Sequence, residues 1–208
     1  MVKEDLYKKS GHYDNYVDAM FPPMEDEGVV YRLKPMNCPS HMTLFNEMGK
    51  HSYREFPLRF AEFATLYRYE KRGELSGLTR VRALTQDDCH VFCTEDQIES
   101  EFTLALNLIR EILDTYKFTD YKVRLSLRGS TGKYVQDDEK WDKATNALRA
   151  ALDKNGVDYF VAEGEAAFYG PKADFIAKDV LGREWQLSTI QVDFIQPARL
   201  GVEYIAED

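Results

Sequence analysis

The segment Arg80-Val81-Arg82-Ala83-Leu84-Thr85-Gln86-Asp87-Asp88-Cys89-His90 has a charged or polar residue at nearly every second position. Side chains on an extended strand alternate between its two faces, so one face would carry a polar row of Arg80, Arg82, Gln86, Asp88 and His90. The opposite face would carry residues that suit packing, apart from Asp87: Val81, Ala83, Thr85 and Cys89. The polar row combines phosphate-binding cations with amine-binding and metal-binding groups, which is typical of the floor of a substrate site.

A second strand is predicted directly before this one. Leu58 to Glu70 is rich in Phe, Tyr and Leu, and the Gly-containing loop Lys71 to Leu78 follows it. A parallel pair needs a crossover of a dozen or more residues, so a loop this short predicts an antiparallel hairpin. Arg68 and Glu70 would share a face, where they could bind a phosphate and an amine or form an ion pair with Arg80 or Arg82.

The remaining elements are predicted from hydrophobic spacing, caps and turn residues. The first thirty residues are polar and turn-rich, and we expect a surface segment there. Strands are expected at Val29 to Lys34, Tyr121 to Leu127, Val157 to Val161, and as a hairpin in Lys172 to Phe194 turning at Leu181-Gly182; helices are expected to start at Asn37-Cys38-Pro39, after the capping box Thr94 to Gln97, and over Asp138 to Leu152. Hairpins with separate helices indicate an α+β fold with a mainly antiparallel sheet, in a single domain over 1–208.

Composition excludes several classes of protein. The 208 residues are 44% hydrophobic and 30% charged, an ordinary balance for a soluble globular chain. A net charge of −9 argues against a protein that coats nucleic acid non-specifically, because such binding depends on an excess of Lys and Arg. Three irregularly spaced cysteines favour a reducing compartment. No apolar run is long enough for a membrane span and no signal peptide is visible, so a cytoplasmic location is expected.

Cys38 and His90 are the candidate metal ligands. Thiolate and imidazole together resemble part of a zinc site, which in catalytic centres has three protein ligands and an open position. The alternative is a buried thiol and a hydrogen-bonded His with no metal. Cys89 and Cys93 are expected to pack. The other histidines lack ligand-like spacing and are expected at the surface: His12, His41 and His51.

A second polar group lies near the end of the chain. Tyr169 and Lys172 flank Gly170-Pro171, a turn that could hold a phenol and an ammonium over a pocket or be a simple loop. Gln186, Thr189 and Gln191 are polar within an apolar strand, where they must bond either the sheet or a ligand. Gln186 has the opposite parity to the other two, so a common site would require a β-bulge near Ser188.

Taken together, these motifs resemble the catalytic domain of the threonyl-tRNA synthetase family, a branch of the class II aminoacyl-tRNA synthetases. The resemblance covers nearly the whole chain and rests on Ser10-Gly11-His12, Met20-Phe21, Lys34 to Pro39, Tyr67 to Glu70, Gly73 to Arg82, Thr85 to His90, Gly164 to Lys172 and Gln186 to Phe194. It implies a mainly antiparallel sheet of six to seven strands flanked by helices. It also implies ATP-dependent activation of L-threonine to threonyl-adenylate, followed by transfer to the 3′ end of tRNA(Thr).

The resemblance also implies a role for each candidate residue. Catalytic roles fall to Arg68, Arg80 and Lys172. ATP, with Mg²⁺, would contact Arg68, Glu70, Arg80 and Gln191. Threonine would contact Met36, Gln86, Asp88, Tyr169, Gln186 and Thr189, with Asp88 accepting from its hydroxyl. Zinc would be held by Cys38 and His90.

The resemblance implies that several family features lie outside these 208 residues. The third zinc ligand, a His, and the motif 3 Arg of the family would lie beyond the segment that matches Tyr204 to Asp208. Most of motif 1, the editing domain and the anticodon-binding domain are also expected to be absent. The family is homodimeric, and the isolated chain is expected to be monomeric or to associate non-natively. Residues with a Cβ replace the family's usual Gly at Ser40, Ala64, Ala83 and Ser188. Two functions therefore stay open: a ligase core impaired by truncation, and a non-catalytic module that binds threonine, an adenylate or a protein partner.

Overall fold

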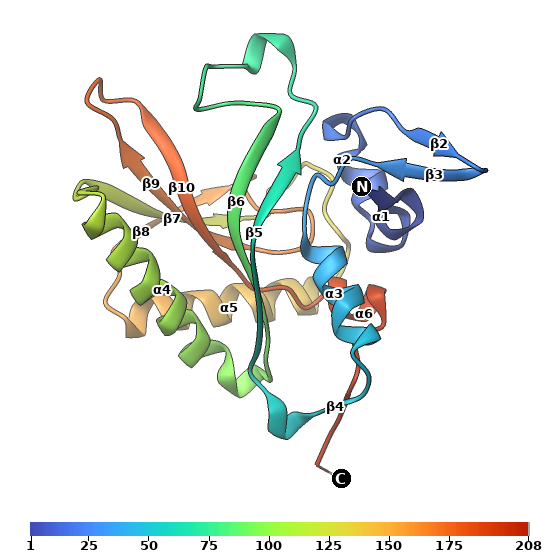
Figure 1. The fold of residues 1–208 in the computed structure, drawn as a ribbon. Helices are drawn as coiled ribbons and strands as arrows, with labels where there is room; N and C mark the ends of the chain where they lie inside the picture. The colour runs from blue at the N-terminus through green and yellow to red at the C-terminus, as the bar shows by residue number, and fades with distance from the viewer. Residues whose placement is uncertain (208) are drawn as a thin grey trace. The chain divides into compact units, whose positions relative to one another are not determined.

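The computed structural model describes residues 1–207, and the backbone divides into two compact units. Unit 1 comprises Met1–Phe92 and the segment from Gln196 onward, and unit 2 comprises Cys93–Ile195. Figure 1 shows the elements of both units along the chain from blue to red.

A long two-stranded hairpin forms the centre of unit 1. Strands β5 (Leu58–Tyr67) and β6 (Ala83–Phe92) pair antiparallel from Leu58 opposite Phe92 to Tyr67 opposite Ala83, as predicted (Figure 1). Helix α3 (Cys38–Glu47) begins with Pro39 in its first turn. The other elements of unit 1 are β1 (Val2–Lys3), α1 (Glu4–Ser10), α2 (His12–Tyr16), η1 (Val17–Ala19), β2 (Met24–Asp26), β3 (Val29–Arg32), β4 (His51–Ser52), η2 (Tyr53–Glu55), η3 (Arg72–Glu74), α6 (Gln196–Leu200) and β11 (Tyr204–Ile205).

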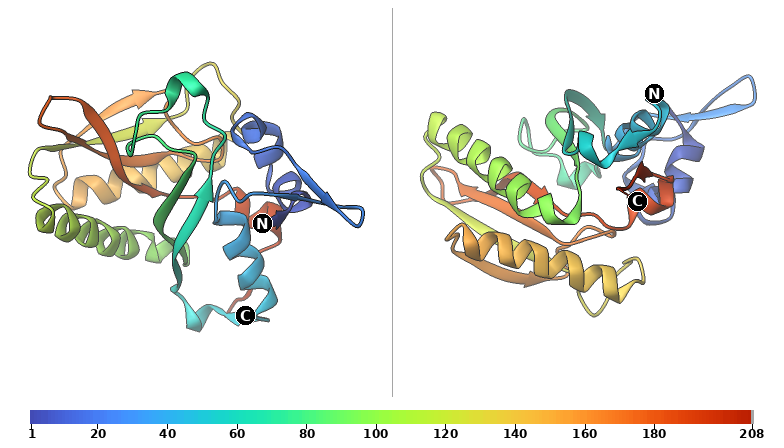
Figure 2. Two further views of the ribbon diagram at one scale, coloured as in Figure 1. Left: turned by 45° about the horizontal axis from the view of Figure 1, so that its top comes forward. Right: turned by 90° about the horizontal axis from the view of Figure 1, so that it is seen from below.

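The expectation of a surface segment holds for much of the first thirty residues but is wrong for α1 and the start of α2. Helices α1 and α2 meet at Gly11, whose φ of 82° lets the chain turn between them, and Tyr7, Ser10 and His12 are fully buried. Glu4 is buried by an ion pair with Arg32 at 2.7 Å. The buried positions are mostly polar, and hydrophobic spacing gave no signal for them. Ser10 and His12 bond each other, whereas Glu4 and Tyr7 bond Arg32 and the Met36 carbonyl, which lie far along the chain. Only the β2–β3 hairpin projects, as both views in Figure 2 show.

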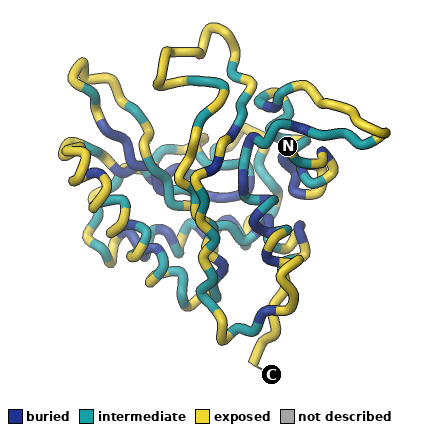
Figure 3. The backbone as a smooth tube through the Cα atoms, in the orientation of Figure 1, coloured by how far each residue is buried: buried dark blue, intermediate teal, exposed yellow. Residues whose placement is uncertain are grey.

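The polar row is shorter than predicted, and the packing face was assigned to the wrong side. Strand β6 begins at Ala83, so Arg80 and Arg82 precede it. The face expected to pack is exposed at Ala83, Thr85 and Cys89, whereas Asp88 and His90 are half-buried. Figure 3 shows exposed and intermediate stretches along the β5–β6 hairpin.

The reason for this reversal lies in helix α3. Its residues Met42 and Phe45 pack against Phe92, Phe60 and Leu58, which lie on the same face of the hairpin as His90. Helix α3 therefore covers the face that carries Asp88 and His90, and the apolar residues next to them on that face form the core with α3.

Unit 2 is a four-stranded sheet with two helices on one face. The strands are ordered β10-β9-β7-β8, with β7 and β8 parallel and the other neighbours antiparallel. Helices α4 and α5 contribute Leu106 and Leu148 to one core with Val123 and Phe175, so both helices cover the same face of the sheet (Figure 1). The elements of unit 2 are η4 (Glu95–Gln97), α4 (Ile98–Thr115), β7 (Tyr121–Leu127), α5 (Asp138–Lys154), β8 (Tyr159–Glu163), β9 (Lys172–Lys178) and β10 (Glu184–Gln191).

The mixture of helices and strands agrees with the predicted class. The strands of residues 1–207 form sheets of three, four, two and two strands, so a single sheet of six to seven mainly antiparallel strands is not confirmed. The predicted capping box at Thr94 is present, and α4 starts directly after it. None of the helices over residues 1–207 combines the length and apolar character that a membrane span requires.

We expect Leu148→Ala to destabilise the chain by about 2–5 kcal/mol, because Leu148 is fully buried in the core of unit 2 and truncation leaves a cavity. Urea unfolding followed by circular dichroism would measure the change. The matched control is Asn146→Ala on the exposed side of the same helix, expected to stay within about 0.5 kcal/mol of wild type. Equal effects of the two variants would contradict the core assignment.

Candidate functional site

In unit 1, Asp88 is half-buried on β6 and is bonded to a residue of one other element. Asn37, at the start of α3, donates its amide Nδ2 to Asp88 Oδ2 at 2.8 Å. Asp88 Oδ2 also lies 3.9 Å from His90 Nδ1. The strand register places Glu62 opposite Asp88. Asp88 is therefore a fixed hydrogen-bond acceptor beside an imidazole.

A chain of hydrogen bonds leads from Glu62 to His90. His41 Nε2 lies 3.2 Å from Glu62 Oε1, and His41 Nδ1 lies 2.7 Å from His90 Nδ1. The carboxylate only accepts, so neutral His41 carries its proton on Nε2 and accepts from His90 through Nδ1. Neutral His90 then has its proton on Nδ1 and a lone pair on Nε2. Burial lowers the pKa of His90, although the charge of Asp88 opposes this, which favours the neutral form.

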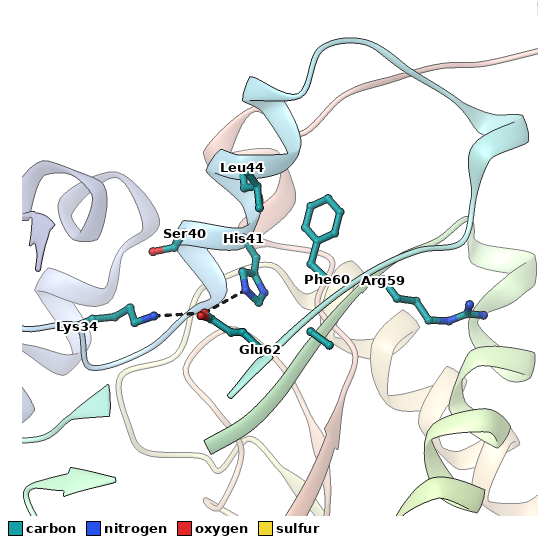
Figure 4. Close-up of a pocket in the computed structure, with 8 residues that line it drawn as sticks. Lys34, Ser40, His41, Leu44, Arg59, Phe60 and Glu62 are labelled. Carbon is teal, nitrogen blue, oxygen red and sulfur yellow. Dashed lines mark hydrogen bonds and ion pairs between the residues drawn. The ribbon is translucent and has the colours of Figure 1, made fainter. Parts of the chain in front are cut away.

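A pocket of about 540 Å³ opens beside this chain of hydrogen bonds (Figure 4). In Figure 4, Lys34 and His41 converge on Glu62, and Lys34 Nζ donates to Glu62 Oε1 at 3.2 Å. The pocket is lined by Lys34, Ser40, His41, Leu44, Arg59, Phe60, Ala61 and Glu62. None of these eight is a predicted ligand-binding residue.

The predicted phosphate-side residues lie where β5 ends. Glu70 accepts from Arg80 Nη2 at 3.0 Å, so the ion-pair alternative is observed for this pair. Arg82 donates twice to the Glu70 carbonyl and stacks on Tyr69, 4.8 Å from the ring centroid. Arg68 differs, because its Nε is buried and has no hydrogen-bond partner within residues 1–207. A buried unpaired donor is costly, so Arg68 is suited to an anionic ligand.

Met36 and Cys38 are positioned from α1. The hydroxyl of buried Tyr7 donates to the Met36 carbonyl at 3.2 Å. Burial raises the pKa of the Tyr7 phenol, and the nearby Cys38 thiolate raises it further. The N-terminal helix thus fixes the backbone between two predicted ligand-binding residues.

Unit 2 gathers its predicted residues on the face of the sheet opposite the helices. Asp174, on β9, is fully buried and accepts from Ser126, Lys172 and Thr189 at 2.7, 3.1 and 2.9 Å. Arg124 Nη2 donates to it at 3.0 Å. Burial would raise the pKa of the Asp174 carboxyl, but these hydrogen bonds and the charge of Lys172 lower it overall.

The β-bulge expected near Ser188 is present. The register of β10 against β9 shifts between Gln186 and Ser188, which puts Gln186 opposite Ile176 and Thr189 opposite Asp174. Both residues then share a face, and Gln186 Nε2 donates to Thr189 Oγ1 at 2.6 Å. Thus the parity conflict in the sequence is resolved by the bulge.

Tyr169 is fixed by a close approach of two backbones. Its hydroxyl donates to Gln191 Oε1 at 2.5 Å. A Cβ on the next residue, Gly170, would lie 2.7 Å from the carbonyl oxygen of Val192, so this position requires glycine. Four of the five predicted residues of unit 2 therefore form two pairs, Tyr169 with Gln191 and Gln186 with Thr189, and Lys172 is bonded to Asp174.

The structure places the thirteen predicted site residues in two sets. Unit 1 contains Met36, Cys38, Arg68, Glu70, Arg80, Gln86, Asp88 and His90, of which Gln86 is exposed on β6 opposite Ala64. Unit 2 contains Tyr169, Lys172, Gln186, Thr189 and Gln191.

Sequence reasoning missed the residues that hold these groups in place. The expectation of surface histidines is wrong, because His12, His41 and His51 are all buried. Their partners are the neighbouring Ser10 hydroxyl, the distant His90 ring and the Phe45 carbonyl, respectively. The position of His41, one helical turn after Cys38, was an available signal. The other missed residues are Lys34, Asn37, Glu62, Arg124, Ser126 and Asp174.

Substitutions for the usual glycines cause no left-handed strain. Among residues 1–207, the only non-glycine residues with positive φ are Glu27 and Lys117. Ser40, Ala64, Ala83 and Ser188 therefore adopt ordinary backbone conformations.

The donor set for zinc is incomplete within the described part of the chain. No group of three or more His, Cys, Asp or Glu side chains there could hold a metal ion. Cys38 and His90 alone do not fit a centre with three protein ligands.

Comparison with known proteins gives the family. Residues 21–208 match the tRNA synthetase class II core domain (G, H, P, S and T). The chain belongs to this family. Its relatives include the threonine–tRNA ligase of Rubrobacter xylanophilus, 72% identical over 100% of this chain and 33% of the relative, and that of Acidithiobacillus ferrooxidans, 52% identical over 100% and 32%. The predicted resemblance to threonyl-tRNA synthetase is thus confirmed.

A solved structure supports the same assignment. The crystal structure of the RNA binding domain of threonyl-tRNA synthetase from Cryptosporidium parvum Iowa II aligns with a TM-score of 0.92 and 43% identity, covering 99% of this chain and 50% of that chain. The chain spans about a third of the length of the curated relatives it matches.

The pH dependence of stability offers a test of the buried His12. Ser10 Oγ donates to the Tyr7 carbonyl at 3.2 Å, so it accepts from His12 Nδ1, 2.8 Å away. Burial lowers the pKa of His12 to about 4. The unfolded chain therefore binds this proton more readily, and the stabilisation from neutral His12 is complete above about pH 6.5 and is lost as the pH falls toward 4.

We expect wild type to lose about 2 kcal/mol more than His12→Asn between pH 6.5 and 5, since each unit of pKa difference corresponds to about 1.4 kcal/mol. Asn keeps a donor near the position of Nδ1 but does not titrate. Urea unfolding at several pH values would measure both slopes. Parallel slopes would show that His12 does not titrate differently in the two states.

Proposed function

We propose that this chain is the threonine- and ATP-recognising part of a threonine–tRNA ligase. The observation that carries the proposal is 72% identity to such an enzyme over the full length of the chain. The substrates would be L-threonine, ATP with Mg²⁺, and the acceptor end of tRNA(Thr).

Asp88 is the group best suited to select threonine. Its carboxylate is anchored by Asn37 and half-buried, so it offers a fixed acceptor to a substrate hydroxyl. Valine lacks that hydroxyl, so it would exclude water from the half-buried carboxylate without replacing the lost hydrogen bond, which costs more than a lost methyl contact. Met36, Gln86, Tyr169, Gln186 and Thr189 would complete the threonine contacts.

Arg68 is the group best suited to bind the α-phosphate and the threonine carboxylate. Its buried Nε would gain a partner when an anion binds. Glu70, Arg80, Lys172 and Gln191 would make the remaining contacts to ATP and to the reacting groups. Arg80 donates to Glu70 through Nη2, and its guanidinium has further N–H groups that would face a phosphate.

The reaction proposed has two steps. A carboxylate oxygen of threonine attacks the α-phosphorus of ATP, and the bond to pyrophosphate breaks as the new P–O bond forms. A ribose hydroxyl at the tRNA 3′ end then attacks the threonyl carbonyl carbon and loses its proton, and AMP leaves. Positioning and neutralisation of phosphate charge by Arg68 and Arg80 would supply most of the rate enhancement.

Some finer expectations stay predictions. These are the six- to seven-stranded sheet, the single catalytic domain over 1–208, a cytoplasmic location and homodimerisation of the full-length enzyme. We derive no step through zinc, because only Cys38 and His90 of its expected ligands lie in the chain.

A non-hydrolysable threonyl-adenylate analogue tests the proposal without requiring turnover. Isothermal titration calorimetry should show that the threonyl form binds more tightly than the valyl form. Arg68→Ala should weaken binding about tenfold or more, as expected when a charge-assisted hydrogen bond is lost. The matched control is Arg54→Ala, at an exposed arginine outside the predicted site, which should bind like wild type. Equal affinity for the two analogues would refute threonine selection.

Activity is measured separately by ATP–pyrophosphate exchange with threonine, valine and serine. Threonine-specific exchange would support the ligase assignment. Tight binding of the analogue without exchange would agree with both a ligase core impaired by truncation and the non-catalytic module.

We expect this chain to bind zinc weakly, because it contributes Cys38 and His90 but no third ligand. Metal content after dialysis would measure retention by wild type, Cys38→Ala and the control Cys89→Ala, whose thiol lies on the opposite face of β6 from His90. Stoichiometric zinc that Cys38→Ala abolishes and Cys89→Ala retains would contradict the expectation.

A further inference from the structure

Asp174 is a buried carboxylate to which neither the sequence motifs nor the proposed reaction assigns a role. It is fully buried on β9, and the sheet register places Arg124 of β7 and Thr189 of β10 directly opposite it on either side. A lone buried charge is strongly unfavourable, so the donors around it must remain in place.

The two carboxylate oxygens have different hydroxyl partners and share Lys172. Oδ2 accepts from Ser126 and Arg124 at 2.7 and 3.0 Å, which ties Asp174 to strand β7. Oδ1 accepts from Thr189 at 2.9 Å, and Lys172 Nζ lies between the oxygens, 3.1 Å from Oδ1 and 3.0 Å from Oδ2. Thr189 and Lys172 are both predicted ligand-binding residues. Asp174 thus joins the scaffold of unit 2 to its predicted binding residues.

The Thr189 hydroxyl links Asp174 to Gln186 and fixes which of the groups donates in each hydrogen bond. Its single proton goes to Asp174, because a carboxylate can only accept, so the hydroxyl must accept from its other neighbour. That neighbour is Gln186, whose Nε2 lies 2.6 Å away. With its NH₂ group held at Thr189, Gln186 is constrained to direct Oε1 elsewhere, and its side chain is exposed.

We propose that Asp174 is a positioning residue that sets the polarity of this face, fixing Gln186 as an acceptor and Lys172 as a donor toward an aminoacyl-adenylate. The nature of that ligand rests on the proposed function. The positioning itself depends only on the hydrogen-bond chain from Asp174 through Thr189 to Gln186. Asp174→Asn would remove the fixed direction of these hydrogen bonds, since an amide can donate as well as accept. It would also leave Lys172 without its counter-charge.

The positioning is tested in the ligand-free chain by NMR of the Gln186 side-chain amide, assigned by the signal that Gln186→Glu removes. Asp174→Asn and Thr189→Val should both move this signal toward the values of a solvated amide, and the double variant should move it no further. Thr189→Ser keeps the hydroxyl and should restore the wild-type signal.

The matched control is Asp179→Asn in the turn of the same hairpin. Asp179 also accepts several hydrogen bonds, from the backbone of Leu181 and Arg183 and from Trp185 Nε1, but it contacts neither Thr189 nor Gln186. Urea unfolding of every variant separates a loss of stability from a loss of positioning. An unchanged Gln186 signal in Asp174→Asn, or an equal change in the control, would overturn the proposal.

Binding of the threonyl-adenylate analogue then tests the ligand. Asp174→Asn should lose about tenfold or more in affinity, the scale expected when hydrogen bonds to a charged group are removed, while Asp179→Asn should bind like wild type. Wild-type affinity in Asp174→Asn would overturn the role of Asp174 in recognition. If wild type itself fails to bind while the Gln186 signal responds as expected, the proposed function fails and the positioning role stands.

Discussion

The antiparallel register between β5 and β6 is the constraint on which the candidate site of unit 1 depends. It runs without a shift from Leu58 opposite Phe92 to Tyr67 opposite Ala83, so it places Glu62 beside Asp88 and Phe60 beside His90. A slip by one residue would turn every one of these side chains to the other face. The aromatic and aliphatic residues that pack against α3 lie on the same side of the hairpin as the polar groups. Their packing therefore also fixes the positions of the polar groups.

The hairpin itself was predictable from the sequence, because strand composition on both sides of a Gly-containing loop is a local signal. The direction in which it packs was not. Thr85 and Cys89 look more suited to packing than Asp88 and His90, yet the latter pair lies on the covered face. Asn37, His41 and Glu62 make burial of these groups tolerable by pairing with them, and such partners come from distant positions that no periodic pattern identifies.

Unit 2 shows a case in which a conflict in the sequence was itself informative. The opposite parities of Gln186 and Thr189 could be reconciled only by an extra residue in β10, and the bulge is present. The buried carboxylate that orients the polar residues of unit 2 could not be found from the sequence in the same way. Asp174 alternates with Ala173 and Phe175 like any strand residue, and its burial depends on Arg124 and Ser126 about fifty positions earlier.

Both units thus use a carboxylate with a defined partner to orient neighbouring groups whose polarity would otherwise be free. An amide or an imidazole can present either a donor or an acceptor, but a carboxylate at the end of a hydrogen-bond chain removes that choice at each link. Glu62 does this for His41 and His90, and Asp174 does it for Thr189 and Gln186. Whether each polar surface presents donors or acceptors is therefore determined by carboxylates behind it. Sequence motifs identify the residues at the surface but not these supporting carboxylates.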